Sequence, residues 1–117
     1  MPLFAKKPQE TAAVTYISYT GVESRIDVPV GDSVMEGAIK NSVDGIVAEC
    51  GGACMCGTCH VYVDEAWLGR LVPIQEDENA MLDTTACPRQ PNSRLGCQIP
   101  VRKDLDGLIV RTPETQQ

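Results

Sequence analysis

The chain has 117 residues, of which 43% are hydrophobic and 22% are charged, so it fits one domain with one core and excludes a second domain. Its 16 acidic and 10 basic residues give a net charge of -6, which repels nucleic-acid phosphates and anionic lipids, and we expect neither as a partner. No apolar run reaches the roughly 18 residues that span a bilayer, and residues 1–10 lack the features of a signal or transit peptide, which predicts a cytoplasmic protein.

The N-terminal part predicts an arm followed by a β-hairpin. Residues 1–11 are polar and aperiodic, so we expect a flexible arm, then a domain over 12–112 and a tail over 113–117. Apolar and polar residues alternate in 13–19 and again in 22–28, with Thr-Gly between the two runs. This pattern predicts two antiparallel strands joined by a turn.

A short helix, a loop and three more strands are expected after the hairpin. Ser33 and Glu36 match the capping box that starts a helix, and the helix should end before Asp44. It would bury three apolar side chains, Val34, Ala38 and Ile39. Residues 46–58 are rich in Gly and Cys and predict a wrapped loop. A strand is expected over 60–63, followed by an irregular stretch over 67–73 and a helix over 75–86. Two further strands are expected over 95–101 and 108–111. The whole reads as a mixed α+β domain with about five short strands.

Cysteine usage gives the strongest functional signal. Four of the six cysteines fall within ten consecutive residues: Cys50, Cys54, Cys56 and Cys59. A reducing compartment opposes disulfides, whereas thiolates grouped on one loop and completed from a distant segment are typical of a metal centre. Three glycines lie among these cysteines: Gly51, Gly52 and Gly57. They let backbone amides approach the sulfur atoms of such a centre.

The spacing separates an iron-sulfur cluster from other metal sites. Cys50, Cys56 and Cys59 follow a C-x5-C-x2-C pattern, and Cys97 follows far downstream. Three thiolates from a loop and one from a strand can surround two irons and two sulfides. Structural zinc prefers two close Cys pairs, and Cys87 and Cys97 are too far apart in sequence to form the second. A redox C-x-x-C is disfavoured because no strand leads into it, and the single His excludes a Rieske centre.

Three segments together resemble a known family. They are CGGACMCGTCHVYV at residues 50–63, ENAMLD at 78–83 and SRLGCQ at 93–98. The chain resembles the adrenodoxin/putidaredoxin class of 2Fe-2S ferredoxins over about residues 14–110. The resemblance implies a β-grasp ferredoxin fold, with a mixed sheet of about five strands, short helices and a cluster-binding loop. It also implies one 2Fe-2S cluster with four ligands: Cys50, Cys56, Cys59 and Cys97.

Three further residues near this pattern need an interpretation, and two of them, Cys54 and His60, allow two. We interpret Cys87 as a small buried thiol and Cys54 as a loop filler, although Cys54 could replace Cys56 as a ligand. The C-x2-C spacing favours Cys56. His60 follows a predicted ligand and could take up a proton on reduction. We favour a structural imidazole bonded to backbone, as the resemblance implies.

The sequence predicts an electron carrier and not an enzyme, because it shows no Ser/His/Asp set and no phosphate-binding loop. The resemblance implies transfer of single electrons from an FAD-containing, NAD(P)H-dependent ferredoxin reductase to a cytochrome P450, in a bacterial monomer. Four acidic side chains of the helix predicted over 75–86 are expected to be available to solvent, and the resemblance places the reductase contact on them: Glu76, Asp77, Glu78 and Asp83. Glu49 is a candidate contact for the oxidising partner. The alternative function is electron supply to iron-sulfur cluster assembly.

Overall fold

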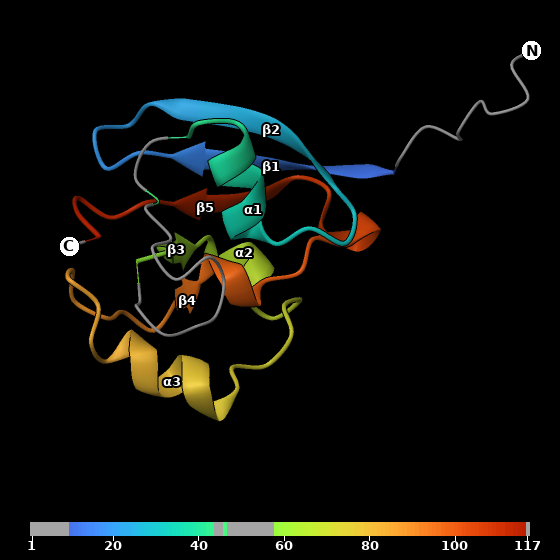
Figure 1. Ribbon diagram of the computed structural model, residues 1–117. Helices are drawn as coiled ribbons and strands as arrows, with labels where there is room; N and C mark the ends of the chain where they lie inside the picture. Colours follow the sequence, from blue (N-terminus) through green and yellow to red (C-terminus); the bar gives the residue numbers. More distant parts are fainter. Residues whose placement is uncertain (1–9, 44–45, 47–57, 117) are drawn as a thin grey trace, which may run out of the picture.

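The computed structural model of the chain describes residues 10–43, 46 and 58–116. Its centre is a five-stranded sheet with the strand order β2-β1-β5-β3-β4 (Figure 1). The strands are β1 (Thr11–Ile17), β2 (Glu23–Pro29), β3 (His60–Val63), β4 (Ser93–Leu95) and β5 (Leu108–Arg111). The helices are α1 (Val34–Lys40), α2 (Glu65–Leu68) and α3 (Glu76–Leu82), with two 3-10 turns, η1 (Gly96–Gln98) and η2 (Lys103–Leu105). Five strands were expected, and five are present in the described residues.

The predicted hairpin is confirmed as β1 and β2, which pair antiparallel with Thr11 opposite Pro29. The turn between them uses Gly21 at φ 91°, a backbone conformation that glycine adopts without strain. β1 begins at Thr11, one residue before the expected start of the domain. On its other edge β1 runs parallel to β5, with Val14 opposite Leu108. The hairpin is thereby joined to the strands that lead to the cysteines.

Helix α1 starts as predicted. The Glu36 amide donates to the Ser33 hydroxyl and the Ser33 amide donates to the Glu36 carboxylate, both at 3.0 Å. Val34 and Ala38 are buried as expected, but Ile39 is 45% exposed, so its predicted burial is wrong. The reason is Gly37, which lies against Tyr16 and Val28 so closely that a Cβ there would be 2.6 Å from a Val28 methyl. The helix face that carries Gly37 meets the sheet, and Ile39 lies about 200° around the helix from Gly37.

The second half departs from the predictions in three places. Residues 60–63 form β3 as expected, but α2 occupies part of the stretch predicted to be irregular, and the Asp64 carboxylate caps it by accepting from the Ala66 amide. α3 is shorter than the predicted helix over 75–86. The strand predicted over 95–101 is wrong, because β4 ends at Leu95 and the chain turns through η1.

The helices occupy different sides of the sheet. α1 lies over one sheet face, and α3 lies beside β4 at the end of the strand order (Figure 1). The core between α1 and the sheet includes the fully buried Tyr16, Val34 and Leu95. The β3–β4 end of the sheet is therefore held between α3 and the rest of the core.

No helix in the described part of the chain is long and apolar enough to cross a membrane.

Candidate metal centre

Two of the four predicted ligands come together at one end of the β3–β4 pair. Cys59 immediately precedes β3, and Cys97 lies in η1 directly after β4. The two strands are antiparallel with His60 opposite Leu95, so the start of one adjoins the end of the other. The Cys97 amide lies 3.5 Å from the Cys59 sulfur, although the residues are 38 positions apart. The pairing of β3 with β4 thus brings a loop cysteine next to the distant one.

The remaining predicted site residues on the cysteine loop lie outside the described residues. They are Glu49, Cys50, Gly51, Gly52, Cys54, Cys56 and Gly57. Their roles, and the choice between Cys54 and Cys56 as a ligand, stay predictions.

N–H groups are directed at the sulfur atoms of both Cys59 and Cys97. Besides the Cys97 amide at Cys59, the Gln98 side-chain Nε2 donates to the Cys97 sulfur at 3.4 Å. The turn that carries these donors is pinned to β3, because the Gly96 amide donates to the Cys59 carbonyl at 2.8 Å. A Cβ on Gly96 would lie 3.2 Å from that carbonyl oxygen and 3.2 Å from the Met35 amide nitrogen. Thiolates with N–H donors at their sulfur atoms suit an anionic iron-sulfur cluster, so these residues fit the cofactor.

His60 connects β3 to β4 through its side chain. It is fully buried, and its Nε2 lies 2.8 Å from the Ser93 hydroxyl. Its ring also contacts Tyr62 edge to face at 4.6 Å between ring centroids. Burial lowers the pKa of His60 to about 4, so the imidazole is neutral near pH 7. We expected the ring to bond to backbone. This prediction is wrong for Nε2, whose partner is the Ser93 hydroxyl on β4.

No sequence pattern predicted the role of Gln116. Its side chain accepts from the His60 amide at 3.1 Å and donates to the His60 carbonyl at 2.8 Å. β5 pairs with β3 only at Tyr62 and Val63, and the Gln116 carboxamide acts as a strand partner two residues further along β3, at His60. Gln116 is 6% exposed. The C-terminal segment therefore supports the residue that follows Cys59.

Glu78 does not belong to a solvent-exposed acidic surface. It is 1% exposed, and its carboxylate lies 2.7 Å from Arg94 Nε and 3.0 Å from Arg94 Nη2. It also accepts from the Leu95 amide at 3.0 Å. Glu78 shares the inner face of α3 with Leu82, one turn later, which is also buried. The prediction that Glu78 is available to solvent is wrong, because its charge is matched inside the protein by Arg94.

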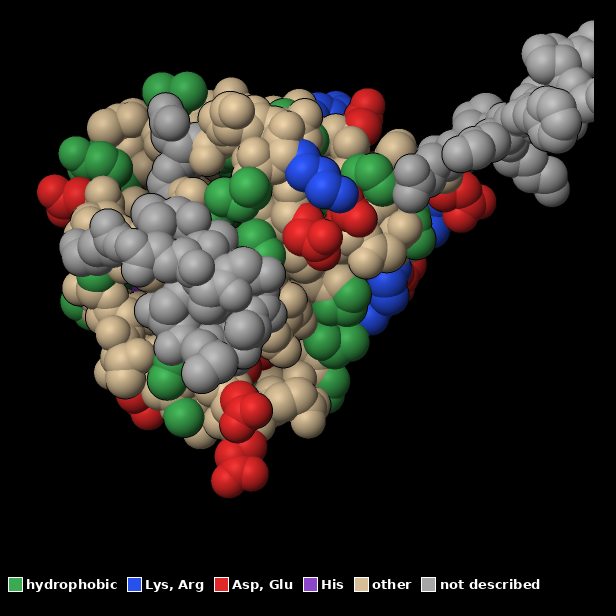
Figure 2. Space-filling model, in the orientation of Figure 1, with side chains coloured by type: hydrophobic (Ala, Val, Ile, Leu, Met, Phe, Trp, Pro, Cys, Tyr) green, Lys and Arg blue, Asp and Glu red, His purple; other side chains and the backbone are tan. Residues whose placement is uncertain are grey.

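The other predicted acidic contacts are on the surface. Glu76 and Asp77 are exposed in the first turn of α3, and acidic side chains project from the molecule where α3 lies (Figure 2). Asp83 is 66% exposed at its side chain and forms an ion pair with Arg89 at 2.9 Å. We name Glu76 and Asp77 the α3 acidic pair. These two carboxylates have no ion-pair partner within the described residues.

Cys87 is the remaining cysteine among the described residues, and it is only half-buried. Its thiol donates to the Thr115 carbonyl at 3.4 Å, next to Gln116. The expectation of a buried thiol is met only in part.

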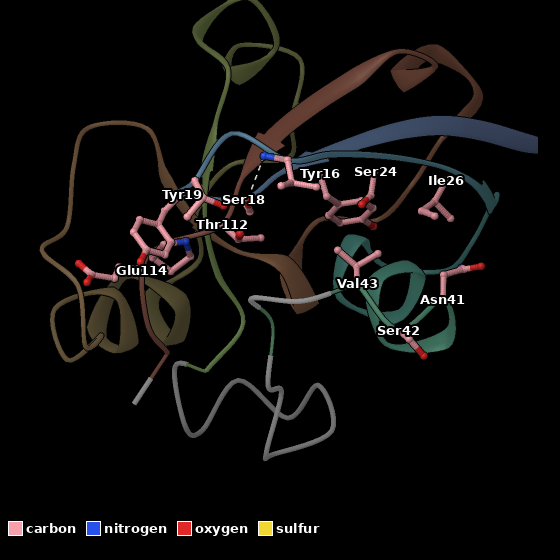
Figure 3. Close-up of a pocket in the computed structure, with 13 residues that line it drawn as sticks. Tyr16, Ser18, Tyr19, Ser24, Ile26, Asn41, Ser42, Val43, Thr112 and Glu114 are labelled. Atoms are coloured by element: carbon pink, nitrogen blue, oxygen red, sulfur yellow. Dashed lines mark hydrogen bonds between the residues drawn. The ribbon is translucent and has the colours of Figure 1, made fainter.

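A separate cavity of about 400 Å³ lies between the β1–β2 hairpin, the end of α1 and residues 112–114 (Figure 3). Hydroxyl and apolar side chains dominate its lining, which includes Tyr16, Ser18 and Val43. Among the described residues that line it, Glu114 supplies the one carboxylate, and neither Cys59 nor Cys97 lines it. The cavity is therefore separate from these two cysteines.

Comparison with known proteins identifies the family. Residues 17–102 match the 2Fe-2S iron-sulfur cluster binding domain. Rhodocoxin from Rhodococcus erythropolis is 52% identical over 88% of this chain and 96% of its own length. Putidaredoxin from Pseudomonas putida is 42% identical over 88% of this chain and 96% of its own length.

Solved structures agree with this assignment. The crystal structure of a ferredoxin from Rhodopseudomonas palustris HaA2 has a TM-score of 0.88 and 48% identity, and covers 90% of this chain and 99% of that one. Putidaredoxin in its covalent complex with putidaredoxin reductase has a TM-score of 0.85 and 41% identity, and covers 87% of this chain and 98% of that one. The expected β-grasp ferredoxin fold is confirmed. The chain belongs to the putidaredoxin/adrenodoxin-type 2Fe-2S ferredoxins, which are electron carriers with one 2Fe-2S cluster and not enzymes.

Proposed function

We propose that this ferredoxin carries single electrons from an FAD-containing, NAD(P)H-dependent reductase to a cytochrome P450 monooxygenase. The observation that carries the proposal is the meeting of Cys59 and Cys97, with N–H donors at both sulfur atoms. The reductase is supported by the putidaredoxin structure in complex with its reductase, to which this chain is similar. The P450 is what the resemblance to this class implies.

We assign the cluster to Cys50, Cys56, Cys59 and Cys97. When bound, the cluster takes up and gives back one electron. The described residues prepare for the added negative charge in two ways. The Cys97 amide and the Gln98 carboxamide direct N–H dipoles at sulfur, and β3–β4 pairing with the Gln116 contact fixes the backbone that follows Cys59. Fixed dipoles reduce the rearrangement that accompanies each electron transfer.

We assign reductase steering to the α3 acidic pair, with Asp83 contributing less because Arg89 pairs with it. Exposed like charges on one face speed the encounter with a basic partner while permitting fast release. A carrier needs both properties because it meets two partners in turn. Glu78 is left out of this surface, since its carboxylate is buried against Arg94. Glu49 stays a candidate for the oxidising partner.

The similarities do not favour the alternative, electron supply to iron-sulfur cluster assembly. We therefore retain one function. A bacterial cytoplasmic monomer is the form that we propose for it.

Reconstitution tests the proposal in two steps. First, NADH and putidaredoxin reductase are mixed with the purified ferredoxin, and bleaching of its visible absorbance reports reduction. Second, a P450 encoded in the same genome is added in its ferric, carbon monoxide-saturated form, and its ferrous-carbon monoxide spectrum reports electron delivery. We expect both steps with the native chain and neither with Cys97→Ala. Reduction of the ferredoxin without delivery to any P450 of that genome, but with delivery to a cluster-assembly scaffold, would overturn the P450 assignment.

A further inference from the structure

We propose that Gln98 is a residue that tunes the cluster, raising its midpoint potential by donating a hydrogen bond from its side-chain amide to the Cys97 sulfur. The proposal rests on the proposed function in one respect, because it takes Cys97 as a cluster ligand. The observation behind it is the 3.4 Å contact between Gln98 Nε2 and Cys97 Sγ. That distance lies within the range for a hydrogen bond to sulfur.

The backbone around Gln98 is fixed on both sides. Before it, the Gly96 amide donates to the Cys59 carbonyl at 2.8 Å, which ties η1 to β3. After it, the Ile99 carbonyl accepts from the Val34 amide at 3.0 Å, which ties the chain to the start of α1. Ile99 is also fully buried. Gln98 therefore projects from a short turn whose two ends are anchored to different elements, so its Cα is held at a fixed position next to Cys97.

The sign of the effect follows from charge. Reduction adds one negative charge, and part of it falls on the sulfur ligands. An N–H donor at a sulfur stabilises the more negative state more strongly, because hydrogen bonds to charged acceptors are the stronger ones. The Gln98 donor therefore favours the reduced form and raises the potential. The Cys97 amide at the Cys59 sulfur belongs to the backbone, whereas the Gln98 donor belongs to a side chain and can be removed by a substitution.

The experiment compares Gln98→Met with Gln90→Met. Met keeps the length of the side chain and removes its N–H donor. Gln90 is exposed, and the same substitution there controls for composition. Midpoint potentials are measured by spectroelectrochemistry on holoprotein, with iron and sulfide quantified for each variant. We expect a shift to more negative potential in Gln98→Met, no shift in Gln90→Met, and unchanged iron and sulfide in both.

A spectroscopic readout tests the contact itself. Pulsed EPR on the reduced protein, with ¹⁵N only in the glutamine side-chain amides, should show a weak hyperfine coupling in the native chain and in Gln90→Met. The coupling should be lost in Gln98→Met. If that variant fails to hold its cluster, Gln98→Asn, which is too short to reach the sulfur, replaces it. The spectrum of the native chain then remains decisive, because the absence of any glutamine coupling overturns the proposal.

The outcomes separate this proposal from the proposed function. A Gln98→Met protein with full iron and sulfide and the native potential overturns the tuning role and leaves the ligand assignment standing. A Cys97→Ala protein with full iron and sulfide and an unchanged visible spectrum overturns the ligand assignment.

Discussion

Glu78 and Arg94 form an ion pair in the interior, in which both side chains are at most 3% exposed and the nearest atoms are 2.7 Å apart. Arg94 also donates to the Val72 carbonyl at 2.8 Å, and Glu78 accepts from the Leu95 amide. The pair therefore fastens α3 and the segment before it to the strand that leads to Cys97. Its role is structural, although Glu78 stands in an acidic sequence.

Removing one partner of this pair should be strongly destabilising. Glu78→Gln leaves the Arg94 charge buried without a counter-charge, which costs about 3 kcal/mol or more, and in a domain of this size lowers the apparent Tm by more than about 10 °C. Asp77→Asn, at the exposed neighbouring position, is the matched control and should change the Tm little. Thermal unfolding followed by circular dichroism measures both. Equal Tm values for the two variants would contradict the structural role of the pair.

Neutralising the α3 acidic pair should slow reduction by the reductase. The double variant Glu76→Gln/Asp77→Asn should lower the second-order rate constant by about tenfold at low salt, since steering by surface charge is lost. The difference should shrink as salt shortens the screening length toward about 3 Å at 1 M. Stopped-flow absorbance measures the rate. The matched control is Glu23→Gln/Asp27→Asn, which removes the same charge from exposed positions on β2. Equal slowing in the control would show that only net charge matters.

Loss of the Gln116 side chain should loosen the backbone beside Cys59. Gln116→Ala leaves the His60 amide and carbonyl without their carboxamide partner, and an unsatisfied buried backbone group costs about 1–3 kcal/mol. We expect faster hydrogen exchange at the His60 amide and faster loss of the visible absorbance on heating. Gln90→Ala is the control. Unchanged exchange at His60 would mean that the C-terminal segment does not support this site.

The midpoint potential should not depend on pH between 6 and 8. Burial holds the pKa of His60 near 4, so the ring stays neutral throughout this range and no proton accompanies the electron. Potentiometric titration at several pH values measures the slope. A slope approaching about 59 mV per pH unit, the value for one proton per electron, would show that a group near the cluster takes up a proton on reduction.

Local patterns predicted the local structure well. The capping box at Ser33 and Glu36 fixed the start of α1, because both partners lie within one turn. The meeting of Cys59 with Cys97 could also be anticipated, since a metal needs ligands from both segments. The cysteine spacing thus carried long-range information that the rest of the sequence lacked.

Residues whose partners are distant in sequence escaped prediction. Glu78 has three acidic or polar neighbours and was expected in solvent, but Arg94, 16 positions away, matches its charge. Gln116 is an unremarkable polar residue whose partner, His60, is 56 positions away. Ile39 was expected inside on hydrophobicity alone, whereas the close approach at Gly37 set which helix face meets the sheet. In each case tertiary contacts decided an outcome that composition could not.

The central claim is that this chain carries one electron at a time on a cysteine-bound 2Fe-2S cluster. A coulometric reductive titration of freshly purified protein, with iron and sulfide quantified on the same sample, tests it most directly. We predict about two irons, about two sulfides and one electron taken up per chain, with an EPR signal that appears on reduction. A colourless protein that holds zinc, or one that takes up no electron, would contradict it.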